Sequence, residues 1–315
     1  MARLEPKRIG IAVVDHLFLF RVPLLAPVWT VFLYGALLGR RSEASLSTGH
    51  LVPALVAFSF LVGGIYILNQ IFDIESDKLN NKLFLLPQRI VRLSTAWIIA
   101  LLSLSVPLVI AFFFSLPLGI VFGLSALVGF FYNCRPLELK NRPYGGLLAN
   151  MLGHGFLTFS AGWLSTAKAD SLMIVPALAV SLANGAVYLI STVLDAGGDG
   201  QTGKRTFAVQ QGERATSIAA LALVAACLAL SFWVVPHRFI LLATAALSLP
   251  FYIALIFRPG RTALFNAMKI PVFVFTLCLV PLAPWYGALI ALTFLGSRLY
   301  YQKRFGKRYP AFGAE

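Results

Sequence analysis

The sequence has few charged residues, and acidic residues are the scarcest. Only 12% of its 315 residues are charged, with 12 Asp or Glu against 26 Lys or Arg. Because soluble domains carry about a quarter of their residues as charged side chains, this composition excludes an ordinary soluble fold. The mean hydropathy of +0.82 and a hydrophobic content of 59% indicate an integral membrane protein instead.

Cysteine and histidine are also scarce. The three cysteines, Cys134, Cys227 and Cys278, lack the spacing of a zinc site and leave an odd number. The four histidines form no cluster in the sequence. Neither a disulfide framework nor a zinc centre is therefore expected.

Long apolar segments fill most of the chain. A membrane-spanning helix needs about 20 apolar residues, and no linker separates a further domain, so we expect one all-α polytopic domain over 1-315. The amino terminus does not resemble a cleavable signal, because Asp15 and Arg21 interrupt its apolar stretch. Ten segments qualify as spans, or nine if the last two are one interrupted helix: 17-39, 51-71, 94-114, 116-132, 145-165, 172-194, 215-235, 239-257, 262-281 and 284-302.

Positive charge is distributed very unevenly over the loops. If the segments alternate in direction, 21 of the 26 Lys and Arg residues fall on one side of the membrane. The positive-inside rule then places the amino terminus (1-15), the basic tail (303-315) and the long polar loops in the cytoplasm of a bacterial or archaeal cell. Since topology and attraction to anionic membrane lipid explain the basic excess, no nucleic-acid partner is expected.

Two acidic motifs follow corresponding spans. Asn69, Asp73 and Asp77 recur every fourth residue at the end of the second span, and Asp195 and Asp199 do so at the end of the sixth. At about 100° per residue, each set shares one helix face, provided that the sixth helix continues for another turn. The offset between the motifs is 122 residues in both cases, so spans 1-4 and 5-8 are expected to be two four-helix quasi-repeats whose interface holds the site.

Four carboxylates gathered at one site repel one another unless cations lie between them. Hard oxygen ligands favour Mg²⁺, which completes its coordination with water and substrate phosphates. The sequence therefore predicts an Mg²⁺ site that binds a diphosphate, with the four aspartates as catalytic candidates. The candidate metal ligands are Asn69, Asp73, Asp77, Asp195 and Asp199.

Basic residues lie beside these motifs. Lys140, Lys204 and Arg205 are the expected partners of the departing diphosphate, since Lys and Arg can neutralise phosphate charge. Arg21 is the only cation within the first span, and an ionisable residue in a membrane segment is a functional candidate. Tyr132 lies in the same loop region as Lys140.

The chain resembles the UbiA superfamily of intramembrane prenyltransferases. That family carries an N-x-x-x-D-x-x-x-D motif after its second helix and a D-x-x-x-D motif after its sixth. It commonly has a Tyr followed by a Lys after helix four, and an Arg near a Pro in helix one. The matching residues here are Asn69, Asp73 and Asp77, then Asp195 and Asp199, then Tyr132 and Lys140, and finally Arg21 and Pro23.

The resemblance implies a helix bundle around a central, lipid-accessible cavity. There Mg²⁺ would bridge the aspartates to an isoprenyl diphosphate, and the isoprenyl group would pass to a small acceptor with release of diphosphate. "NQIFDIESDKLN" is most similar to the homogentisate branch, whereas "GKRTFAVQQG" is similar to menaquinone- and chlorophyll-forming members. An aromatic quinone precursor is therefore the expected acceptor.

Two other functions compete with this prediction. A terpene cyclase of the same superfamily would consume the diphosphate without an acceptor. A membrane transporter also combines repeats with intramembrane charges. The sequence argues against the transporter, because Lys269 is the only Asp, Glu or Lys well inside any expected span.

Overall fold

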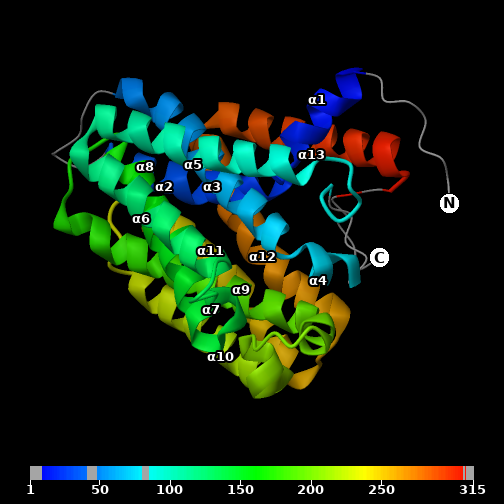
Figure 1. Ribbon diagram of the computed structural model, residues 1–315. Helices are drawn as coiled ribbons and strands as arrows, with labels where there is room; N and C mark the ends of the chain where they lie inside the picture. Colours follow the sequence, from blue (N-terminus) through cyan, green and yellow to red (C-terminus); the bar gives the residue numbers. More distant parts are fainter. Residues whose placement is uncertain (1–8, 41–47, 80–84, 308, 310–315) are drawn as a thin grey trace.

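The structure is a computed structural model that describes residues 9-40, 48-79, 85-307 and 309. Its regular elements are helices, with no β-strand among the described residues. The long helices lie side by side as a bundle (Figure 1). The predicted all-α polytopic fold is confirmed.

The helices follow the expected order, but several of the expected spans are divided into shorter helices. The first half contains α1 (Ile9–Phe18), α2 (Val22–Gly39), α3 (Leu51–Phe72), α4 (Ile74–Leu79), α5 (Leu93–Phe114) and α6 (Leu116–Asn133). The second half contains α7 (Pro143–Asn150), a π-helical turn (Met151–Leu157), α8 (Thr158–Leu164), α9 (Ile174–Gln201), α10 (Phe207–Ser231), α11 (Arg238–Phe257), α12 (Arg261–Leu279) and α13 (Pro284–Phe305).

Eight helices in the described ranges are long and apolar enough to cross a membrane, namely α2, α3, α5, α6, α9, α10, α11 and α12. The expected segment 145-165 is instead divided into α7, the π-helical turn and α8. The segments 262-281 and 284-302 form two separate helices, because the 3₁₀ turn Val280–Leu282 interrupts the regular helix between them. The chain is an integral membrane protein.

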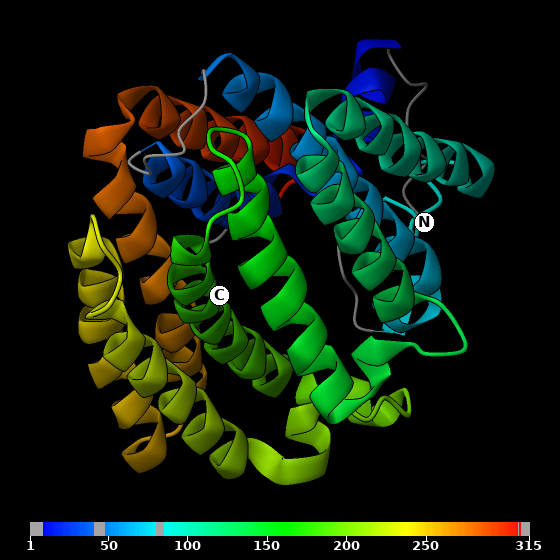
Figure 2. The same cartoon turned by 90° about the vertical axis from the view of Figure 1, so that its left-hand side faces the viewer.

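Corresponding helices of the two halves pack in the same way. Helix α3 packs along α5 and α5 along α6, as α9 packs along α10 and α10 along α11. In Figure 2 the blue-to-teal helices α3, α5 and α6 lie on one side of the bundle, and the green-to-orange helices α9 to α12 lie on the other. This arrangement agrees with the expected pair of quasi-repeats.

Helices α2 and α8 join the two halves at a close crossing. A Cβ atom on Gly35 would collide with the carbonyl oxygen of Phe159, and one on Gly162 would collide with that of Phe32. Small residues at membrane helix interfaces allow backbones to approach closely. Each position therefore requires glycine, because the backbone of the other helix leaves no space for a Cβ atom.

We expect Gly162→Val to destabilise the protein by about 2 to 3 kcal/mol, because the collision is with backbone that cannot rotate away. Thermal unfolding in detergent measures the effect. Gly296→Val on α13 is the matched control, since a Cβ on Gly296 meets open space. Equal melting temperatures for the two variants would contradict this account of the crossing.

The first and last described helices lie against each other, as Figure 1 shows for α1 and α13. The Asp15 carboxylate is buried and accepts a 2.7 Å hydrogen bond from the Tyr300 hydroxyl. Arg304 Nε also donates to it at 3.1 Å, and the Phe18 ring stacks on Tyr300 with centroids 3.7 Å apart. We call Asp15, Phe18, Tyr300 and Arg304 the terminal clasp.

The expected first span, 17-39, is interrupted at Arg21. This residue has a positive φ of 50°, separating α1 from α2. The amide of Gln70 donates a 2.7 Å hydrogen bond to the Leu19 carbonyl and holds the interruption against α3. Arg21 consequently lies at the mouth of the bundle rather than within a helix.

Candidate functional site

The first acidic motif spans the junction of α3 and α4. Asn69 lies in the last turn of α3, and Asp73 caps that helix with φ −102° and ψ 9°. Helix α4 starts at the next residue, and the Asp77 N–H donates to the Asp73 carbonyl at 2.8 Å. The motif therefore covers two helices rather than the single expected helix end. Asp73 and Asp77 are both buried.

The second motif lies on one uninterrupted helix. Helix α9 continues through Asp195 and Asp199 to Gln201, which is the extra turn that brings both aspartates onto one helix face. Gly203, with φ 74°, then reverses the chain, and the Lys204 N–H donates to the Asp199 carbonyl at 3.0 Å. A glycine in the left-handed region is a common end for a helix, and here it returns Lys204 toward the motif.

Lys204 joins the two motifs. Its Nζ lies 3.4 Å from Asp73 Oδ1 and 3.7 Å from Asp199 Oδ1. Burial alone lowers the pKa of Lys204, but the carboxylates of Asp73 and Asp199 outweigh it and hold that pKa above its ordinary value. The Lys204 ammonium is therefore charged at neutral pH, and it brings together carboxylates 126 residues apart in sequence.

Lys140 supplies a second cation to Asp73. It lies in the 3₁₀ turn Leu139–Asn141, only 7% exposed, and its Nζ donates to Asp73 Oδ1 at 2.9 Å. Burial raises the pKa of Asp73, but the ammonium groups of Lys140 and Lys204 outweigh it, so that pKa is lower than usual. Asp73 is therefore an ionised carboxylate at physiological pH.

Arg21 contacts the first motif from the other side. Its Nη1 donates to Asn69 Oδ1 at 3.2 Å, and its Nη2 lies 3.7 Å from Asp77 Oδ2. The Asn69 amide in turn donates at 2.9 Å to Asp73 Oδ2 and at 2.9 Å to Asn133 Oδ1. Three cations, Arg21, Lys140 and Lys204, thus contact Asp73, Asp77 and Asp199.

A cavity of about 500 Å³ opens below these charges. Along α3 its lining runs from Asn69 to Phe58, or 11 residues, so it extends about 16 Å along the helix axis. Its deep end is apolar, with Phe58, Val62 and Val28 in the wall. The cavity is therefore polar at its mouth and apolar at depth.

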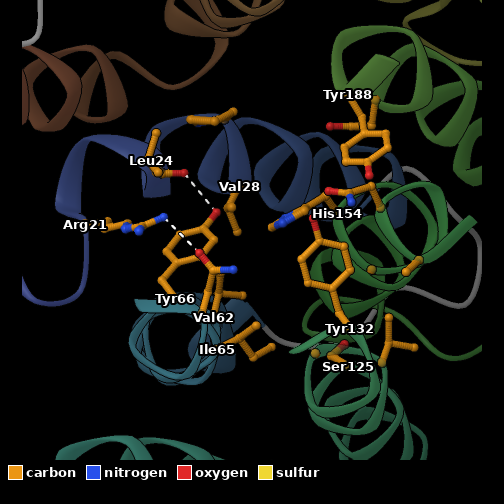
Figure 3. Close-up of a pocket in the computed structure, with 18 of the residues that line it drawn as sticks. Arg21, Leu24, Val28, Val62, Ile65, Tyr66, Ser125, Tyr132, His154 and Tyr188 are labelled. Carbon is orange, nitrogen blue, oxygen red and sulfur yellow. Dashed lines mark hydrogen bonds between the residues drawn. The ribbon is translucent and has the colours of Figure 1, made fainter. Parts of the chain in front are cut away.

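Aromatic and polar side chains face one another across this cavity. Figure 3 shows Arg21 and Tyr66 on one side and Tyr132, His154 and Tyr188 on the other. Tyr132 lines the cavity together with Asn150 and Tyr188. The predicted candidate Tyr132 thus lines the cavity wall rather than contacting the lysines.

Two predicted site residues lie apart from this network. Arg205 is exposed. Asp195 is also exposed and forms no ion pair with any described residue, although it lines the cavity. No three His, Cys, Asp or Glu side chains converge as a ready metal site in the described ranges, because lysines separate the acidic residues.

Sequence reasoning missed Asn133 and Tyr188. Asn133 is fully buried, accepts from Asn69 and donates from its own Nδ2 to the Gly129 carbonyl at 2.9 Å. A polar residue directly after Tyr132, at the end of an apolar span, was the signal that could have identified it. Tyr188 lies in the middle of a span, where nothing in the sequence distinguishes it from an ordinary packed tyrosine.

The donor chemistry of the first motif and of Asp199 suits Mg²⁺. Asp73, Asp77 and Asp199 offer carboxylate oxygens, and Asn69 offers an amide oxygen. Such hard oxygen ligands, with no thiolate or imidazole among them, favour Mg²⁺. With Asp195 included, four carboxylates face three cations, which leaves the site negatively charged.

Known proteins share this fold. A structure of a UbiA homologue from Archaeoglobus fulgidus bound to DMAPP and Mg²⁺ superposes with a TM-score of 0.66 at 19% identity, covering 88% of this chain and 98% of that one. The apo structure of a UbiA homologue from Aeropyrum pernix gives a TM-score of 0.60 at 19% identity, covering 88% of this chain and 99% of that one.

A similar curated protein is the digeranylgeranylglyceryl phosphate synthase of Sulfolobus acidocaldarius. It is 28% identical over 174 residues, which cover 54% of this chain. The chain thus spans 60% of that relative's length. The model of the UbiA prenyltransferase family matches residues 28–270, from α2 to α12. Since this match covers far more than half of the chain, the protein belongs to the UbiA prenyltransferase family.

Proposed function

We propose that this chain transfers an isoprenyl group from an isoprenyl diphosphate to a small acceptor, with release of diphosphate. The observation that carries the proposal is the meeting of two acidic motifs at Lys204, above an apolar cavity. A polar mouth and an apolar interior correspond to the two parts of such a donor.

The three cations at the mouth suit the diphosphate. Lys140, Lys204 and Arg21 all lie within 4 Å of a site carboxylate, and all three are largely buried. Charge-assisted hydrogen bonds from such groups are stronger than neutral ones. The isoprenyl tail would follow α3 from Asn69 toward Phe58, where the lining is apolar.

Asn69, Asp73, Asp77, Asp195 and Asp199 are the residues that would hold Mg²⁺. When bound, this ion offsets the negative charge of the site and neutralises phosphate oxygens. Structures of a UbiA homologue from Archaeoglobus fulgidus bound to Mg²⁺ together with DMAPP or GPP support the same ion here.

The transfer breaks the bond between C1 of the isoprenyl group and the diphosphate oxygen. The electron pair leaves with the diphosphate, whose growing charge is stabilised by Lys140, Lys204 and Arg21. The acceptor supplies the electron pair of the new bond to C1 and loses a proton to solvent at the mouth. Apolar side chains such as Val62 and Phe58 exclude water from the electrophilic carbon.

Two arguments bear on the class of acceptor, and they favour different molecules. The loop sequences favour an aromatic quinone precursor, whereas the name of the Sulfolobus relative indicates a glyceryl phosphate acceptor for that protein. The distribution of Lys and Arg favours a site at the cytoplasmic face of the membrane. Both acceptor types can reach that face.

The proposal is tested by incubating purified protein with Mg²⁺, diphosphates of several chain lengths and a panel of acceptors, followed by mass spectrometry. We expect a prenylated acceptor and one diphosphate per product, both lost on chelation. Diphosphate released with a hydrocarbon or alcohol in the absence of acceptor would identify a terpene cyclase. Counterflow in liposomes without chemical turnover would identify a transporter.

A further inference from the structure

A second cavity, of about 900 Å³, adjoins the central one near its polar mouth. It is bounded by the last turns of α9 and by the first turns of α10 and α12. Ser191 and Asp195 line both cavities. We call this second cavity the α9–α12 groove.

The groove results from a break in α10. Gly212 has φ 80° and ψ 165°, which interrupts the helix and starts a new segment at Glu213. Glu213 lines the groove at that point. Opposite it, α12 starts after Gly260 and contributes Leu264, Phe265 and Met268 to an apolar wall.

Positive charge flanks that wall. Arg261 Cζ lies 5.8 Å from the centroid of the Phe265 ring, and Lys269 Nζ lies 4.8 Å from it. Arg261 is exposed and forms no salt bridge with Glu213 or Asp195 in the described part of the chain. The groove therefore combines an accessible guanidinium, an aromatic face and carboxylates at Asp195 and Glu213.

We propose that the α9–α12 groove binds the acceptor, a molecule with an anionic head group, an apolar body and a nucleophilic hydroxyl or electron-rich ring. The inference rests on the proposed transfer. If the donor tail fills the central cavity, the acceptor must reach the reacting carbon of the donor by another route. Arg261 binds the anion, and Phe265 with Met268 packs against the apolar body. The nucleophile reaches the donor beside Asp195, where the two cavities meet.

Acceptors that differ only in charge provide the test. A hydroxybenzoate and a monoalkyl glycerol phosphate are compared with uncharged counterparts, a hydroxybenzyl alcohol and a monoalkyl glycerol. We expect Arg261→Gln to raise KM for the anionic acceptors about tenfold, as loss of about 1.4 kcal/mol implies. KM for the uncharged acceptors and for the donor should stay within about twofold of wild type. Phe265→Ala should raise KM for all acceptors but not for the donor.

Arg258→Gln is the matched control, because Arg258 is exposed three residues before Arg261 and does not line the groove. Calorimetric titration of the hydroxybenzoate and of the glycerol phosphate in the absence of donor measures binding separately. Wild-type binding that Arg261→Gln weakens, without product formation, would support the groove and refute the transfer. Turnover or binding unchanged by Arg261→Gln and Phe265→Ala would overturn the groove. Equal competition by a dialkyl glycerol phosphate without a hydroxyl would assign it to membrane lipid and overturn it as well.

Discussion

Asp73→Asn is expected to lower kcat/KM for the isoprenyl diphosphate about 10³-fold. Asp73 Oδ1 accepts from Lys140 at 2.9 Å and lies 3.4 Å from Lys204, so its carboxylate fixes both proposed diphosphate partners. The amide removes a candidate Mg²⁺ ligand and leaves two largely buried ammonium groups without their shared carboxylate. Steady-state kinetics at saturating acceptor measure the loss.

Glu75→Gln is the control for this variant. Glu75 lies two residues further on, its side chain is 83% exposed, and among the described residues it pairs with Lys78 alone. The Glu75→Gln substitution removes one negative charge from the same segment without affecting the buried network, so activity should stay within about twofold of wild type. A comparable loss in both variants would show that Asp73 acts only through the net charge of the segment.

Lys140→Gln is expected to lower kcat/KM about 10²-fold, mainly through kcat. The Lys140 ammonium is 7% exposed, so its charge acts at short range in a poorly solvated region and stabilises the diphosphate as it departs. Single-turnover measurement of diphosphate release separates this step from acceptor binding.

Lys78→Gln is the corresponding control on the exposed pair of Lys78 and Glu75, whose contribution is small because solvent screens it. A loss in Lys140→Gln confined to the acceptor KM, with donor kinetics unchanged, would contradict a role at the diphosphate. Lys140 would then be a structural partner of Asp73 alone.

The parts of the fold that follow from helical periodicity were predictable. Composition and apolar length gave the all-α membrane bundle, and the four-residue spacing of Asp195 and Asp199 required the extension that α9 provides. The equal offset of the two motifs anticipated their approach to each other, because helices that correspond in a repeat end at the same face. These inferences need only local sequence and topology.

What could not be predicted depends on contacts distant in sequence. Nothing near Asp73 indicates that a second helix, α4, starts at the next residue, and the bridging position of Lys204 depends on the reversal at Gly203. The interruption at Arg21 is held by Gln70, 51 residues beyond the carbonyl it binds. The α9–α12 groove likewise results from Gly212 and from the packing of α12 against α9.

The terminal clasp has a consequence for biosynthesis. Arg304 is 289 residues from Asp15, so the clasp cannot form until almost all of α13 has left the ribosome. Arg21 lies three residues after the end of α1, and its guanidinium contacts Asn69 and Asp77. A nascent chain therefore inserts most of its helices before the clasp beside Arg21 can close, which happens only when translation is nearly finished.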